Sequence, residues 1–268
     1  MKHLYSMGYL TGNGVDPVSA VRIAAEHGYD MISFRLLPAG PGDQIPPLLD
    51  DDPLVREVMA AMRDTGLTMS DAEMIRLKPE TRLGEFDRFI ERIAQMGARH
   101  VLVAVDDTEL ARTKQNFAAL CERLAPYRLT ADLEFMPWTG VKDLTTAREI
   151  VEAADHPGAA VLFDALHFDR CGSTLDDFQQ LPRALMNYVQ ICDGPVPFDP
   201  SDAELIRIAR TARMIPGEGD IDLQAIAALI PADMMISVEV PNHALAQEIG
   251  ASEVARRSLL AAKRLFSD

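Results

Sequence analysis

The feature that most constrains the fold is a regular alternation of short apolar runs with amphipathic segments along the whole chain. Apolar runs of strand length separated by helical patterns are typical of βα units in a parallel sheet. We count eight such runs, of which seven are followed by a clear helical pattern. The expected strands are residues 3–10, 30–37, 68–75, 100–106, 130–137, 159–167, 187–193 and 234–241. Eight units in 268 residues predict a single-domain α/β protein, the (β/α)8 TIM barrel.

The boundaries of several expected helices are marked by capping residues. Two pairs place a carboxylate before a proline that suits the first helical turn, and these are Asp16-Pro17 and Asp52-Pro53. Three amphipathic segments end at a glycine, which can adopt the left-handed conformation needed there, and these are Gly28, Gly66 and Gly97. The last helix is expected from Glu253 to about Phe266, after the eighth strand.

The chain contains no Ser/Gly-rich linker or low-complexity tract, so we expect residues 1–268 to form one domain. The least regular stretches are residues 38–52 and 194–220, and each follows the carboxyl end of an expected strand. That end of a TIM barrel carries the loops that bind substrate. Both stretches are therefore candidate substrate loops.

Charge and cysteine content argue against several classes of partner. The 41 acidic and 26 basic residues give a net charge of −15, which disfavours binding to nucleic acid or anionic membranes. The three cysteines are widely spaced and include no Cys-x-x-Cys pair, which favours a reducing compartment. The first residues lack the apolar core of a signal peptide, and no stretch approaches the ~20 apolar residues of a membrane span. We therefore expect a cytoplasmic protein.

Four polar residues interrupt strands that should be apolar. They lie toward the carboxyl ends of the fifth to eighth expected strands and are Glu134, Asp164, Gln190 and Glu239. Burying a carboxylate alone costs on the order of several kcal/mol unless it is paired or bound to a metal. A buried arginine, a lysine or backbone amides could satisfy any single one of them. Because no comparable series of Lys or Arg lies in the same strands, a cation is the simplest common partner.

Three carboxylates and one amide oxygen form a hard, all-oxygen ligand set. Such a set suits one divalent ion of the Mg²⁺ or Mn²⁺ kind better than the imidazole-rich sets that zinc and copper prefer. An ion held by two vicinal substrate oxygens would polarise a carbonyl and acidify the neighbouring C–H bond. A ligand carboxylate could then accept the proton.

Five segments carry a resemblance to a known family. They are Glu-Phe-Met-Pro-Trp at 134–138, Asp-Ala-Leu-His at 164–167, Gln-Ile-Cys-Asp at 190–193, Arg-Met-Ile-Pro-Gly-Glu-Gly at 213–219 and Val-Glu-Val-Pro at 238–241. Together they resemble the xylose isomerase-like TIM-barrel superfamily. This superfamily includes sugar and sugar-phosphate isomerases and epimerases, inosose dehydratases, 3-dehydroshikimate dehydratases and apurinic endonucleases. The resemblance spans the chain and specifies the superfamily more firmly than a reaction.

The resemblance implies roles for individual residues. Glu134, Asp164, Gln190 and Glu239 would occupy the four metal positions, and Glu134 and Glu239 would also serve as acid and base on opposite faces of the substrate. His167 matches a histidine that contacts substrate oxygens. The family places an arginine beside the active site where this chain has Arg213, at the start of its Pro-Gly-Glu-Gly segment.

Two departures from the pattern separate the possible reactions. Many epimerases have histidine as the third ligand, whereas Gln190 resembles the choice of some bacterial 3-dehydroshikimate dehydratases. Members of that dehydratase group can carry a histidine where this chain has Met136. Each reaction therefore lacks one of its expected residues.

Further candidates for substrate binding are three arginines and one tryptophan. Arg170, Arg35 and Arg213 could hold a phosphate or carboxylate in a bidentate geometry, although each could equally be paired on the surface. Trp138 could line the pocket or pack in the core.

Two enzymatic functions and one binding function fit these features. The first is a metal-dependent isomerase or epimerase of a keto-sugar or related polyhydroxy carbonyl compound, acting by proton abstraction through a metal-stabilised enediolate. The second is a dehydratase of a cyclic hydroxy-ketone such as 3-dehydroshikimate or inosose, which shares the first step. The third is a non-catalytic barrel in which the metal is structural. A nuclease is disfavoured by the acidic surface and the scarcity of histidines at strand ends, and the sequence leaves homo-oligomerisation open.

Overall fold

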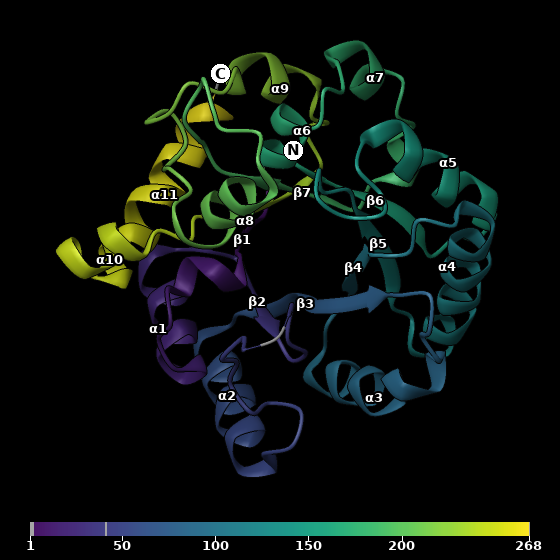
Figure 1. Cartoon of the computed structure of the whole chain (residues 1–268). Coiled ribbons are helices and arrows are strands. Elements are labelled where there is room, and N and C mark those ends of the chain that lie inside the picture. The colour runs from purple at the N-terminus through teal and green to yellow at the C-terminus, as the bar shows by residue number, and fades with distance from the viewer. Residues whose placement is uncertain (1–2, 41, 268) are drawn as a thin grey trace.

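The computed structural model is an eight-stranded parallel barrel surrounded by helices (Figure 1). The structure describes residues 3–40 and 42–267. Four residues of the expected domain lie outside this range: Met1, Lys2, Asp268 and Pro41, the last of which belongs to the expected 38–52 loop. The strands close in the order β1 to β8. Their bounds are β1 Tyr5–Met7, β2 Met31–Arg35, β3 Thr68–Leu77, β4 His100–Val105, β5 Thr130–Glu134, β6 Ala159–Asp164, β7 Tyr188–Ile191 and β8 Met235–Val238. All eight expected strands and the single-domain TIM barrel are confirmed.

The helices lie outside the ring of strands, as Figure 1 shows. The α-helices are α1 Pro17–His27, α2 Asp52–Thr65, α3 Asp87–Met96, α4 Leu110–Leu124, α5 Leu144–Ala154, α6 Ala165–Arg170, α7 Leu175–Gln179, α8 Asp202–Thr211, α9 Leu223–Leu229, α10 His243–Ile249 and α11 Ala251–Leu265. The described residues also form four 3₁₀ turns: η1 Tyr9–Gly12, η2 Leu83–Phe86, η3 Ala125–Tyr127 and η4 Arg183–Leu185. Within the described residues, no helix is both long enough and apolar enough to cross a membrane.

Most of the expected helix boundaries are confirmed, and one cap was assigned to the wrong residue. Asp16 caps α1 by accepting a hydrogen bond from the backbone N–H of Ser19 at 2.9 Å. The three expected glycines end α1, α2 and α3 in the left-handed conformation. The cap of α2 is Asp51, which accepts from Leu54 N–H, while Asp52 is already the first helical residue. The last helix begins at Ala251 and ends at Leu265, close to its expected bounds.

Two expected segments differ from the structure, and local contacts explain both differences. The strand expected over 159–167 ends at Asp164, because the Asp164 side chain accepts from His167 N–H and starts α6. The irregular stretch 194–220 contains α8, a helix whose Leu205, Ile208 and Ala209 are buried. Their i, i+3, i+4 spacing is that of an amphipathic helix, which the proline-rich flanks obscured.

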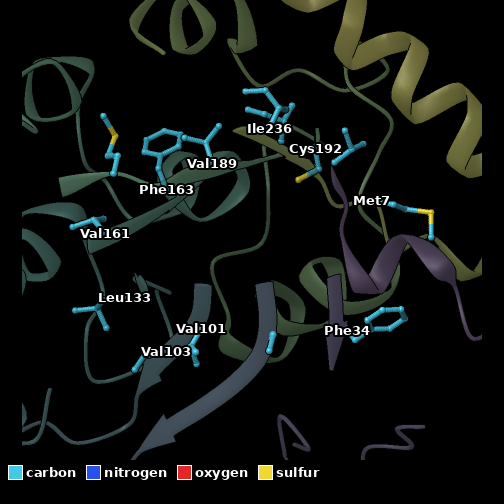
Figure 2. Close-up of a cluster of buried hydrophobic side chains, with 14 of the residues drawn as sticks. Met7, Phe34, Val101, Val103, Leu133, Val161, Phe163, Val189, Cys192 and Ile236 are labelled. Atoms are coloured by element: carbon cyan, nitrogen blue, oxygen red, sulfur yellow. The ribbon is translucent and has the colours of Figure 1, made fainter. Parts of the chain in front are cut away.

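Side chains of the strands alternate between the two faces of the barrel wall. One set, which includes Leu133, Phe163 and Val189, packs against the helices in the large outer core (Figure 2). The alternate residues Leu102, Leu162, Tyr188 and Met235 form a smaller cluster, which this period of two places inside the barrel. The same alternation therefore fixes which polar strand residues point toward the barrel axis.

Polar residues also occupy the interior below the carboxyl ends of the strands. Asp71 of β3 is fully buried; one of its oxygens accepts from Ser70 Oγ at 2.6 Å, and its Oδ2 has no partner among the described residues. Burial and the neighbouring Glu73 raise the pKa of Asp71 to about 8. The carboxyl group of Asp71 is therefore protonated at neutral pH.

We expect Asp71→Asn to gain stability relative to the parent as the pH rises. Between the ordinary pKa of 3.8 and about 8, folded Asp71 keeps a proton that the unfolded chain releases, so the free energy of unfolding of the parent falls as pH increases. The asparagine amide removes this loss. Urea denaturation should show the difference between variant and parent increasing by roughly 2–4 kcal/mol from pH 5 to pH 8. The exposed control Asp64→Asn should show no such trend, and identical profiles for the two variants would contradict the assignment.

Candidate functional site

The four polar residues singled out in the sequence meet at the carboxyl end of the barrel. Glu134 and Asp164 are the last residues of β5 and β6, and Asp164 pairs in register with Gln190 of β7. Glu239 directly follows β8, and its backbone N–H continues the ladder by donating to Ile191 at 3.1 Å. The alternation of side chains turns all four inward. They are between 0% and 4% exposed, so any charge they carry must be compensated locally.

Arg213 supplies a positive charge between two of these carboxylates. Its Nη1 donates to Asp164 Oδ2 at 2.6 Å, and its Nη2 lies 3.4 Å from Glu239 Oε2. Its backbone N–H donates to Pro241, which holds the segment after α8 across the barrel end. The buried arginine considered as an alternative partner therefore exists, and it comes from a loop rather than from a strand.

His167 lies at the same centre, on α6. Its backbone N–H donates to Asp164 Oδ1 at 3.0 Å, its Nε2 lies 3.6 Å from Glu134 Oε1, and its Nδ1 has no partner among the described residues. Burial lowers the pKa of His167 to about 4, so the ring is neutral at neutral pH. Glu134, Asp164 and His167 each offer a ligand atom, and these atoms lie within 4.8 Å of one another. The structure thus adds His167, expected only as a substrate contact, to the residues that could hold a metal.

Several buried polar atoms of the site have no hydrogen-bond partner among residues 3–40 and 42–267. Both side-chain amide atoms of Gln190 and Oε1 of Glu239 are in this state. A buried polar atom without a partner costs about 1–3 kcal/mol, so such atoms gather where a ligand completes their contacts. An amide oxygen and a carboxylate oxygen fit a hard divalent cation. The residues present therefore suit a divalent metal.

The carboxyl groups of the site differ in their affinity for protons. Burial, followed by the charge of Asp164, raises the pKa of Glu134 well above its usual range. Burial, followed by the charge of Glu73, does the same to the pKa of Glu239. Burial also acts on Asp164, but the Arg213 guanidinium and the hydrogen bond from His167 N–H outweigh it and lower the pKa of Asp164. Carboxyl groups whose environments separate their pKa values are the usual means of acid–base chemistry at one site.

Arg35 of β2 and Glu73 of β3 form a buried ion pair beside the centre, and only Arg35 was named from the sequence. Arg35 donates to Glu73 Oε2 from Nε at 3.0 Å and from Nη2 at 2.6 Å. Arg35 was a candidate for anion binding, whereas Glu73 was missed. The signal was present, because Glu73 is an acidic residue between the apolar Ala72 and Met74 of an expected strand, as Glu134 is between Leu133 and Phe135.

Arg170 and Trp138 line a cavity of about 110 Å³ beside His167. The Arg170 guanidinium is paired with Asp169, donates to the carbonyl of Pro195 at 2.7 Å and stacks on Phe198 at 4.1 Å. These contacts tie α6 to the loop after β7. The Trp138 ring meets the His167 ring edge to face at 5.1 Å. Trp138 thus forms a wall of this cavity, while Arg170 is engaged by the loop.

The fold and the centre define a TIM-barrel protein with buried carboxylates at the carboxyl ends of its strands. The chain belongs to the xylose isomerase-like TIM barrel family, whose model matches residues 21–264. It is 25% identical over 239 residues to an inosose isomerase of Bacillus velezensis, covering 82% of this chain and 81% of the relative.

The IolI protein, solved with a zinc atom, superposes with a TM-score of 0.82 and 20% identity, covering 100% of this chain and 98% of the other. The probable 3-DHS dehydratase AsbF of Bacillus anthracis gives a TM-score of 0.74 and 18% identity, covering 98% of each chain. The similarity to an inosose isomerase supports an enzyme and leaves its type open, whereas the two solved structures support the fold.

We expect Arg213→Gln to destabilise the metal-free protein. Loss of the guanidinium leaves Asp164 and Glu239 buried without their cation, which costs about 3 kcal/mol in comparable buried pairs. Urea denaturation in the presence of a chelator measures this loss. The control Arg256→Gln removes an exposed pair with Glu253 and should cost less than about 1 kcal/mol. Equal small effects of both substitutions would show that Arg213 does not neutralise the centre.

Proposed function

We propose that the protein is a divalent-metal-dependent isomerase or epimerase of a small polyhydroxy carbonyl compound, such as a keto-sugar or an inosose. The observation that carries this proposal is the presence of two inward-facing glutamates with raised pKa values around buried polar atoms that lack partners. A carboxyl group with a raised pKa can both accept and return a proton near neutral pH. The similarity to an inosose isomerase agrees with this chemistry.

Glu134, Asp164, Gln190 and Glu239 would hold the metal ion in this proposal. Their oxygen atoms favour Mg²⁺ or Mn²⁺, whereas participation of His167 would favour a softer ion such as the zinc found with IolI. When bound, the ion supplies the polarisation of a substrate carbonyl that weakens the neighbouring C–H bond.

The protein's own residues would bind the substrate and move the proton. Glu239 or Glu134 removes a proton from the carbon next to the carbonyl, and the other glutamate returns one from the opposite face in an epimerisation. His167, neutral because of its lowered pKa, can donate a hydrogen bond to a substrate hydroxyl. Arg213, whose guanidinium contacts Asp164 and Glu239, would donate to a substrate oxygen once a bound metal releases it from Asp164. Trp138 forms an apolar wall, and Arg170 holds the loop that covers this side of the site.

The likeness to AsbF favours one second candidate, a dehydratase of a cyclic hydroxy-ketone. The first step is the same removal of a proton next to the carbonyl. A protonated glutamate would then give its proton to the departing β-hydroxyl group, which leaves as water. The raised pKa of the remaining glutamate suits this role as an acid.

Turnover in D₂O with Mn²⁺-loaded protein tests both candidates. An isomerase or epimerase should release product deuterated at the carbon next to the carbonyl from keto-sugars, their phosphates or an inosose, because the base exchanges its proton with solvent. A dehydratase should instead yield a conjugated product that absorbs in the ultraviolet from 3-dehydroshikimate or an inosose. Absence of exchange and turnover across the panel would contradict an enzymatic function and leave a binding barrel with a structural metal.

The substitution Glu239→Gln tests whether the Glu239 carboxylate takes part in proton transfer. Turnover should fall by about 100-fold or more, as expected on loss of a general base, in samples whose metal content equals that of the parent. Glu134→Gln provides the second variant if Glu239→Gln loses the metal. The exposed carboxylate of Glu218 gives a matched control, because Glu218→Gln should leave turnover unchanged. Full activity in metal-loaded Glu239→Gln and Glu134→Gln would overturn the assigned roles.

A further inference from the structure

A cavity of about 350 Å³ lies at the carboxyl ends of β1 and β2, and its lining includes none of the four proposed metal ligands. Its floor is apolar and comes from Met7, Ile32 and Phe34 of β1 and β2. Its rim is polar and includes Arg35 and Arg210. A small organic ligand with one charged group fits such a surface, because pockets of this size combine apolar walls with a few polar anchors.

We propose that this cavity binds an anionic group of the substrate, a carboxylate or a phosphate, and that Arg210 at the end of α8 is its main positive anchor. The inference rests on the proposed function in that the same substrate reaches the carboxylate centre. The inference specifies in addition that the substrate is anionic, which the residues of the carboxylate centre do not determine.

Three observations link the lining of this cavity to buried carboxylates at the same end of the barrel, one to Glu239 and two to Glu73. A Cβ atom on Gly8 would lie 3.0 Å from Cβ of Glu239, and the next residue, Tyr9, lines the cavity. Ser33, also in the lining, donates to Glu73 Oε1 at 3.3 Å. Arg35 reaches from the cavity rim to the buried Glu73. In this proposal, a substrate whose carbonyl lies at Glu239 extends its far end past Tyr9 and Ser33 into the cavity.

Among the described residues Arg210 has no direct acidic partner, although the charge of Asp43, which pairs with Arg35 at the same rim, partly offsets its own. In the part of the chain that the structure describes, Arg210 has neither an ion pair nor a hydrogen bond, although the chain carries a net charge of −15. Arg207, one turn earlier on α8, pairs with Glu204 at 2.6 Å. Arg35 at the same rim is occupied by Glu73 and lies 3.4 Å from Asp43. Arg210 is therefore the guanidinium at this rim that is free to bind an anion.

The surroundings of Arg210 also favour an incoming anion. Partial burial, followed by the charges of Arg35 and Arg76, lowers the pKa of Arg210. A bound carboxylate or phosphate would offset this repulsion between neighbouring guanidinium groups. Arginine binds both kinds of oxyanion through two parallel hydrogen bonds, so the geometry admits either source of charge.

Calorimetric binding of two matched probe pairs tests the proposal without turnover. Quinate and quinamide share one polyhydroxy ring and differ in the charge of the carboxyl group, whereas fructose 6-phosphate and fructose differ in a phosphate. For the metal-loaded parent protein, one charged probe should bind about tenfold or more tightly than its neutral partner, equivalent to about 1.4 kcal/mol. The pair that shows the preference identifies carboxylate or phosphate as the anion.

Arg210→Gln should reduce this preference to less than about threefold, whereas Arg207→Gln on the same helix should retain it. Equal binding within both probe pairs, no measurable binding of either charged probe, or equal effects of the two substitutions would overturn the proposal. A charge preference that depends on Arg210 in a protein without turnover would leave the anion site standing and count against the proposed reaction alone.

Discussion

The structure at the carboxyl end of the barrel depends on the compensation of buried negative charge. The alternation of side chains along β5 to β8 turns Glu134, Asp164 and Glu239 toward one another in a region from which water is largely excluded. Arg213 neutralises part of this charge through Asp164 and Glu239, and burial raises the pKa values of the two glutamates. This balance accounts for the loop that brings Arg213 across the barrel and for the short helix α6, whose first turn is capped by Asp164. A divalent ion would enter a centre that already requires positive charge.

The fold could be predicted from sequence because each βα unit repeats a local pattern. Strand residues were recognisable as apolar runs, and glycines such as Gly28 marked helix ends through a backbone requirement that depends on no distant partner. The convergence of Glu134 and Asp164 followed from topology, since carboxyl ends of successive parallel strands share one face. The partners of these residues could not be predicted in the same way. Arg213 reaches Asp164 across 49 positions of sequence, and the pairing of Glu73 with Arg35 depends on the register of β2 and β3.

The two proposed reactions share their first step, the removal of a proton next to a carbonyl. What distinguishes an isomerase from a dehydratase is the fate of the resulting electron pair and the groups that hold the rest of the substrate. In this chain those groups lie on two sides of the centre. Trp138 and Arg170 line the smaller cavity, whereas Arg35 and Arg210 lie at the rim of the larger one. Differences in these walls can therefore select a substrate without altering the carboxylates.

The most direct test of the proposed centre is anomalous diffraction from crystals of the protein soaked with Mn²⁺. We expect one ion per chain in contact with Glu134, Asp164, the amide oxygen of Gln190 and Glu239, with the Arg213 guanidinium withdrawn from Asp164 Oδ2. The unpartnered amide of Gln190 is the feature that makes this geometry specific. An ion held by Glu134, Asp164 and His167 without Gln190, or no ion at the barrel end, would contradict the proposed ligand set.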